Sequence, residues 1–163
     1  MPLNTVALEL VPPNTDRTPD EILEEARKVV QLSADTGLTG RIGHVMIPGM
    51  IEEDGDRPIE MKPKLDVLDY WSRISPILPG VRGLCTQVTP FMDEPTLVSR
   101  LTALLDAGME GVAFVGVPRT MNDGEGAGVA PTDALNIFSE LVTNRGAILI
   151  PTSSSGSGSR RGW

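Results

Sequence analysis

The stretch Val6-Ala7-Leu8-Glu9-Leu10-Val11-Pro12-Pro13 decides the expected fold. Its apolar run predicts a strand over residues 6–11, and the two prolines end that strand because proline cannot continue a ladder of hydrogen bonds. A helix is expected next, since Thr18 can cap it, Pro19 suits its first turn and acidic residues follow at the positive end of its dipole. Strand, turn and helix form one βα unit, the building block of a parallel α/β sheet.

The same alternation continues along the chain. Further strands are expected over residues 41–47, 83–89, 111–117 and 146–150, and further helices over residues 66–74, 94–107 and 132–142. Apolar residues at helical spacing predict the buried stripe of the first helix: Ile22, Ala26, Val29 and Val30. Gly108 is placed to end the helix over residues 94–107. Five strands with four helices suit either a doubly wound sheet or part of a TIM (β/α)8 barrel. The barrel is favoured because it gathers the loops after all strands at one end.

Composition excludes several classes of protein. The 163 residues carry 14 Lys and Arg against 22 Asp and Glu, a net charge of -8, so nucleic acid and anionic membrane surfaces are not expected partners. No apolar run approaches a membrane span and no leader opens the chain, which predicts a cytoplasmic protein. One His and one Cys exclude a His/Cys zinc cage and a triad with a spare imidazole.

Glu9 is the first candidate for chemistry. A carboxylate inside an apolar strand is costly to bury unless it has a partner or works as a proton donor with a raised pKa. Two interpretations therefore stay open at this point: a structural ion pair with Arg41 or Arg82, or a general acid.

Two loops and three single residues complete the candidates. The acidic loop over residues 52–57 lacks the spacing of a calcium loop, so no metal is expected there. The glycine-rich loop over residues 122–128 could cradle a phosphate, but it lacks the dinucleotide fingerprint and a mobile loop is favoured. His44 is expected as a hydrogen-bonded interior residue, and Cys85 and Trp71 as packing residues.

The first strand and its Pro-Pro turn resemble the opening of methylenetetrahydrofolate reductases, in which an acidic residue precedes such a turn. The likeness covers most of residues 5–151. It continues through Leu84-Cys85-Thr86-Gln87, through Glu94-Pro95-Thr96-Leu97, and through Ala113-Phe114-Val115-Gly116 with the loop that follows.

This resemblance implies a (β/α)8 barrel that transfers hydride from NADH or NADPH to 5,10-methylenetetrahydrofolate, giving the 5-methyl form, with Glu9 as the acid. Thr86, Gln87, Gly116 and Arg119 are then expected to bind the cofactor. FAD is typical of the family, but Val117 stands where the family has an Asp near the flavin, and Leu84 stands where it has a His. The chain therefore resembles a flavin-independent, actinobacterial-type branch.

The predicted number of strands is smaller than the family's barrel needs, which predicts a truncated barrel domain over residues 1–152 with impaired or no activity. Residues 153–163 (SSSGSGSRRGW) are expected to form a flexible tail. An open sheet edge would favour association, so a homo-oligomer is expected. The alternative hypotheses are a non-catalytic half-barrel that pairs with itself or a partner chain, and a doubly wound phosphate-binding domain.

Overall fold

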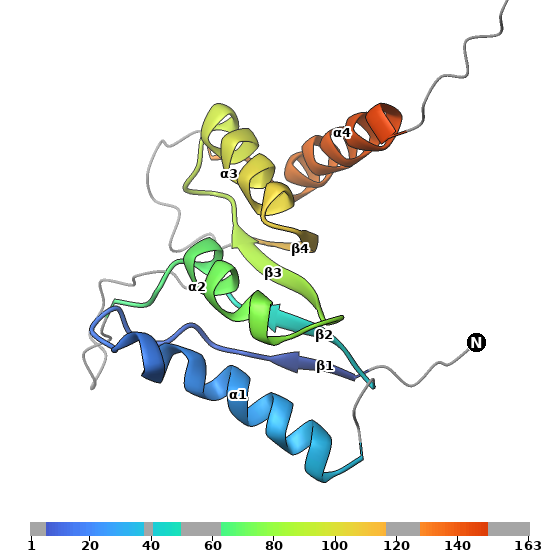
Figure 1. Ribbon diagram of the computed structural model, residues 1–163. Helices are drawn as coiled ribbons and strands as arrows, with labels where there is room; N and C mark the ends of the chain where they lie inside the picture. The colour runs from blue at the N-terminus through green and yellow to red at the C-terminus, as the bar shows by residue number, and fades with distance from the viewer. Residues whose placement is uncertain (1–5, 38–40, 50–62, 117–127, 150–163) are drawn as a thin grey trace, which may run out of the picture.

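The structure, a computed structural model, describes residues 6–37, 41–49, 63–116 and 128–149. Figure 1 shows strands and helices alternating along the chain. In chain order the elements are β1 (Val6–Glu9), α1 (Pro19–Asp35), β2 (Ile42–Ile47), α2 (Val67–Ile74), the short 3-10 helix η1 (Ser75–Ile77), β3 (Arg82–Val88), α3 (Glu94–Asp106), β4 (Met109–Val115) and α4 (Pro131–Leu149).

The four strands form one parallel sheet in the order β1-β2-β3-β4. The expected α/β class is thereby confirmed. The order runs in one direction and never reverses, whereas a doubly wound sheet has a reversal at its switch point. Because right-handed crossovers between successive neighbours all return on the same side, the helices gather on one face of the sheet. This arrangement, visible in Figure 1, is the one that consecutive units of a βα barrel adopt.

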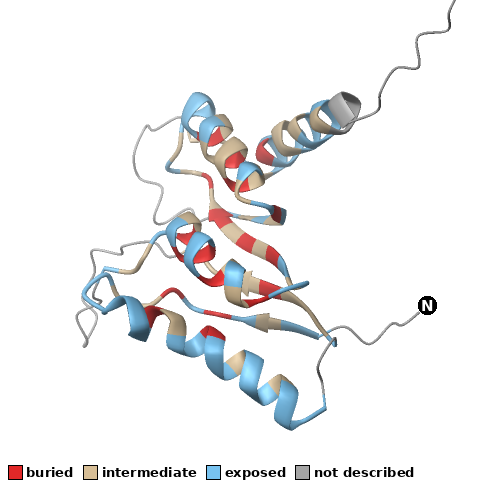
Figure 2. Cartoon of the chain, viewed as in Figure 1, coloured by how far each residue is buried: buried red, intermediate tan, exposed pale blue. Residues whose placement is uncertain are grey.

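The hydrophobic core lies between the helices and one face of the sheet, which we call the helix-covered face. Its strand residues include Val45, Ile47 and Cys85, all fully buried. The helices contribute these buried residues: Ile22, Ala26, Val67, Tyr70, Trp71, Ile74, Leu97, Leu101, Leu104 and Ala134. Figure 2 shows buried residues on the inner side of each helix and at alternate positions along β3. That alternation is the period-two pattern of a strand with one packed face.

The helix ends follow local sequence rules. Thr18 caps α1, as the sequence predicted, and the structure adds a capping box with Glu21. Asp66 and Asp93 cap α2 and α3 through side chains that accept from backbone N–H groups. Gly108 follows the C-terminal end of α3 and has a φ of 82°, a backbone conformation that favours glycine. The predicted stripe of α1 was wrong at Val30, which is 44% exposed.

The predicted fifth strand was wrong. Residues 146–149 continue α4, which extends to Leu149 instead of ending near residue 142. A short apolar run fits the end of a helix as well as a strand, so periodicity could not separate the two. Arg145 holds this part of α4 beside α3 by donating to the Thr102 carbonyl at 3.1 Å and to the Asp106 carboxylate at 2.7 Å. The predicted tail lies outside the described residues.

The other face of the sheet, which we call the open face, has no helix against it in the described part of the chain. The register places these residues on it: Ala7, Glu9, His44, Met46, Arg82, Leu84, Thr86, Val88, Gly111, Ala113 and Val115. All of them are exposed or half-buried. In a βα barrel this face would line the interior.

Candidate functional site

The candidate site lies at the carboxyl edge of the sheet. Because all four strands are parallel, Glu9, Ile47, Val88 and Val115 end at the same edge. In parallel α/β folds, ligands bind at this edge because the loops that follow the strands meet there.

Glu9 is the last residue of β1, which ends two residues before the predicted residue 11, and it lies on the open face in register with Met46 of β2. The expectation of a buried carboxylate was wrong, since Glu9 is exposed where no described element covers the open face. The structural alternative also finds no support. No ion pair joins Glu9 to Arg41 or Arg82, both of which the structure describes, and Arg82 instead binds Glu110 at 3.2 Å. The carboxylate therefore faces solvent at the edge where a ligand would bind.

Thr86 lies on the open face near the end of β3. Its hydroxyl oxygen accepts a hydrogen bond from the backbone N–H of Gly49 at 2.7 Å. Gly49 follows β2, so this bond joins the carboxyl ends of two neighbouring strands. A side chain at Gly49 would not fit, because an added Cβ would lie 2.4 Å from the Thr86 carbonyl oxygen.

Gln87 points the opposite way, into the helix-covered face, where it is 8% exposed. Its side-chain oxygen accepts from Arg100 Nε at 3.3 Å, and its amide nitrogen donates to the Val88 carbonyl at 3.2 Å. Arg100 in turn binds both carboxylate oxygens of Asp66. Burial alone would raise the pKa of Asp66, but the hydrogen bonds and charge of Arg100 hold it below its usual value. The structure thus separates Gln87 from Thr86, its neighbour in the sequence.

The remaining predicted cofactor residues follow β4. Gly116 is exposed directly after Val115, and an added Cβ would make only an ordinary contact with Pro131 at 3.5 Å. Arg119 and Val117 lie outside the described residues, as do the acidic loop and most of the glycine-rich loop.

The loops at this edge contact one another at their described ends. Thr15 N–H donates to the Pro63 carbonyl and Leu65 N–H to the Pro13 carbonyl, both at 2.9 Å, so the chain entering α2 lies beside the turn after β1. The pairing of Asn14 with Lys64 forms an antiparallel bridge at the same place. This contact could not be predicted from the sequence, because no local pattern in either segment indicates it.

A second contact joins the chain before α4 to the turn after β3. Val129 N–H donates to the Met92 carbonyl at 3.0 Å. Gly128 lies so close to the turn that an added Cβ would fall 1.6 Å from the Pro90 carbonyl oxygen. Backbone contacts between neighbouring loops therefore recur along the carboxyl edge.

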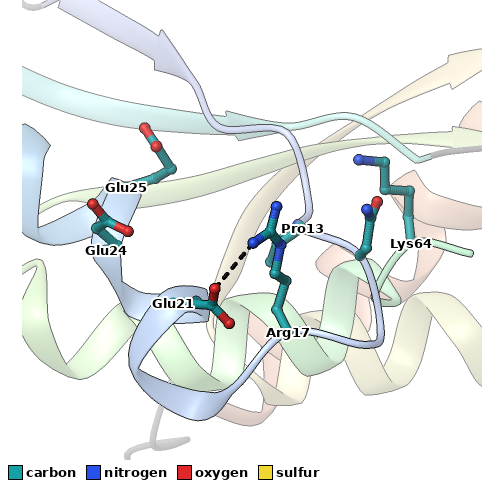
Figure 3. Close-up of a pocket in the computed structure, with 7 residues that line it drawn as sticks. Pro13, Arg17, Glu21, Glu24, Glu25 and Lys64 are labelled. Atoms are coloured by element: carbon teal, nitrogen blue, oxygen red, sulfur yellow. Dashed lines mark hydrogen bonds and ion pairs between the residues drawn. The ribbon is translucent and has the colours of Figure 1, made fainter. Parts of the chain in front are cut away.

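A shallow pocket of about 210 Å³ lies beside the turn after β1 (Figure 3). It is lined by Pro13, Asn14, Arg17, Glu21, Glu24, Glu25 and Lys64. Arg17 and Glu21 point toward each other across it and form an ion pair of 3.0 Å. The volume is below the roughly 300–1,000 Å³ of small-molecule sites, so the pocket is too small to enclose a folate or a dinucleotide.

The single residues weighed from the sequence have these positions. Cys85 is fully buried, as expected, and burial raises the pKa of its thiol to about 11. Trp71 packs in the core, also as expected, and its Nε1 donates to the Ala107 carbonyl at 2.9 Å. His44 is half-buried on the open face, between Ala7 and Arg82 in register. Among the described residues, no three His, Cys, Asp or Glu side chains cluster closely enough to hold a metal ion.

Fold and site together define a class: a parallel α/β protein of consecutive βα units whose candidate site, at the carboxyl edge, carries a carboxylate at the end of the first strand. No helix in the described ranges is both long and apolar enough to cross a membrane. The family model of mycobacterial methylenetetrahydrofolate reductase matches residues 2–162. The chain belongs to this family, and the resemblance drawn from the sequence is confirmed. A search of curated proteins found no match.

Proposed function

We propose that the chain is a methylenetetrahydrofolate reductase that reduces 5,10-methylenetetrahydrofolate to 5-methyltetrahydrofolate. The observation that carries this proposal is the family match over residues 2–162. The position of Glu9, exposed at the carboxyl end of β1, supports it, since a proton donor must be accessible to its substrate.

In the proposed reaction, Glu9 protonates a folate ring nitrogen, and the bond from that nitrogen to the methylene carbon breaks. The resulting iminium accepts a hydride at the same carbon, and the nicotinamide is oxidised to NAD(P)+. Glu9 is left as a carboxylate and regains a proton from solvent. A bound folate would cover this part of the open face, where the carboxyl group of Glu9 is accessible to it.

We propose NADH or NADPH as the direct hydride donor, without flavin. Leu84, one of the two residues that replace expected flavin contacts, lies half-buried on the open face in register with Met46. Thr86 and Gly116 suit the donor site because one lies on the open face and the other is exposed after β4. Arg119 follows on the same loop. We do not include Gln87 among the residues that contact the hydride donor, because its side chain faces the core.

The proposed barrel is supported by the strand order and by the helices gathered on one face. The residues on the open face would then surround the substrate together with further strands. Such an interior would exclude water from the iminium, which water would otherwise attack.

The test is the loss of reduced-nicotinamide absorbance that depends on added 5,10-methylenetetrahydrofolate, followed for the wild type and for Glu9→Gln. Removing a general acid typically costs a factor of 10² to 10⁴, so we expect the variant to lose at least about a hundredfold in kcat. Glu140→Gln is the matched control because Glu140 is exposed on α4, away from the carboxyl edge. Equal turnover by Glu9→Gln and the control would overturn the role of Glu9.

A second candidate function is a half-barrel that associates with another copy or a partner chain. It is favoured by the two edge strands, whose outer sides have no strand partner among the described residues, and by the exposed apolar residues Val6 and Val115, 43% and 40% exposed. Light scattering of the purified protein distinguishes the states: a mass of two or more chains supports association, and a clean monomer contradicts it.

A further inference from the structure

We propose that Thr86 is a positioning residue: its hydroxyl holds residues 48–49, which we call the turn after β2, at the carboxyl edge in the place that ligand binding requires. The inference rests on the proposed function, because the ligands are those of the reductase. It assigns Thr86 a role that acts through Gly49, in addition to its place on the open face.

The contact between Thr86 and Gly49 depends on the side chain at both positions: a hydroxyl at residue 86 and no Cβ at residue 49. The hydroxyl oxygen accepts the Gly49 N–H at 2.7 Å, and the absence of a Cβ at Gly49 lets its backbone approach β3. The bond joins residues 37 positions apart, so it closes a long loop and is not a local turn contact. It therefore decides where the chain leaves β2 relative to β3.

The backbone beneath Thr86 is held from the opposite face. Gln87, the next residue, accepts from Arg100, and Arg100 binds the carboxylate of Asp66, which also caps α2. These bonds join the end of β3 to α2 and α3. Charge-assisted, two-point contacts of this kind are among the more rigid side-chain interactions. Thr86 is thus a fixed point to which the turn after β2 is attached.

The positions of neighbouring residues explain why such a fixed point would matter. Glu9 and Met46 lie in register, and Met46 is three residues before Gly49. A shift of the turn would change the surface next to Glu9 at the edge where the folate and the nicotinamide must meet. Misplacement by about 1 Å can cost a large factor in rate or affinity in a site of this kind.

The experiment compares Thr86→Val, which removes the acceptor at nearly constant shape, with Thr86→Ser, which restores it. Thr143→Val is the matched control, because Thr143 is exposed on α4 and bonds only within its own helix. Three quantities are measured for each variant: hydrogen exchange of the Gly49 amide, the dissociation constants of NADH and 5,10-methylenetetrahydrofolate, and the urea midpoint of unfolding.

We expect Thr86→Val to speed exchange at Gly49 and to weaken at least one ligand by about fivefold, the factor that matches loss of one typical hydrogen bond. Thr86→Ser and Thr143→Val should resemble the wild type in the exchange rate at Gly49 and in ligand affinity. Gly49→Ala is the second variant, used also if Thr86→Val does not fold. Its Cβ pushes the turn away from β3 and removes no polar group, so it should weaken the same ligand.

The inference is overturned if exchange at Gly49 rises in Thr86→Val while both ligands bind as in the wild type. It is also overturned if Thr86→Val loses affinity and Gly49→Ala does not, since Thr86 would then act only by direct contact. A wild-type protein that binds neither ligand overturns the proposed function and this inference with it.

Discussion

Packing between α2 and β3 predicts a compensating pair of substitutions. Trp71 is 4% exposed, and its ring lies against Gly83, where an added Cβ would fall 2.8 Å from the ring atoms Cε2 and Cζ2. The same Cβ would be 2.7 Å from the Met109 sulfur. Gly83→Ala should therefore overpack the core and lower the free energy of unfolding by about 1–3 kcal/mol.

Trp71→Phe acts in the opposite direction on volume. It removes the hydrogen bond from Nε1 to the Ala107 carbonyl and leaves a space where the larger ring was, so it should cost about 2–4 kcal/mol. In the double variant, the methyl group at position 83 occupies part of that space. The loss of unfolding free energy in the double variant should then be smaller than the sum of the losses in the two single variants by about 1 kcal/mol or more.

The assay is urea unfolding followed by circular dichroism for the wild type, the two single variants and the double variant. Gly111→Ala is the matched control because its Cβ would press on Leu84, 2.9 Å away, on the open face. Combined with Trp71→Phe, it should be additive to within about 0.5 kcal/mol. Additivity of Gly83→Ala with Trp71→Phe to the same degree would refute the packing we describe.

Three further predictions concern groups with altered ionisation. Burial raises the pKa of Tyr70 to about 12, and its buried hydroxyl has no hydrogen-bond partner in the described structure. Tyr70→Phe should therefore raise the free energy of unfolding, measured by urea titration, by about 1 kcal/mol. A loss of stability would instead reveal a hydrogen-bond partner of the hydroxyl. Because the pKa of Asp66 is held below its usual 3.8, the ion pair with Arg100 stabilises the folded state above that pH and is lost as the pH falls through the lower folded value. The stability advantage of the wild type over Asp66→Asn, measured by urea unfolding from pH 7 to pH 2.5, should shrink below about pH 4, and a constant difference would contradict the pair. Since burial raises the pKa of Cys85 to about 11, a disulfide reagent at pH 8 should modify the folded protein far more slowly than the urea-unfolded protein, and equal rates would show that the thiol is accessible.

Much of the fold could be predicted because its determinants are local. Thr18 and Pro19 start α1 through a cap and a fixed φ, and Gly108 takes up the positive φ after α3. The apolar runs over β2 and β3 could be predicted as strands from their own composition, and each needs only a neighbouring strand to pair with. The run over residues 146–149 was different, since a strand and the end of a helix suit it equally and the contacts of Arg145 are made across space.

The site was predictable in position but not in environment. Glu9 could be placed at a strand end because prolines follow it, but its exposure depends on what covers the open face. Thr86 and Gln87 are neighbours in one strand and so must point to opposite faces, but only the packing of β3 against the helices decides which of them lies on the open face. The contact between Thr86 and Gly49 requires a glycine at one position and a hydroxyl 37 residues later, a pairing that no local pattern marks.

The most direct test of the central claim is the folate-dependent oxidation of NADH and NADPH by the purified protein, without added flavin, compared between the wild type and Glu9→Gln. We expect 5-methyltetrahydrofolate and NAD(P)+ in equal amounts from the wild type, and at least about a hundredfold lower turnover from the variant. Absence of folate-dependent oxidation in a folded wild-type protein, or equal turnover by the two proteins, would contradict it.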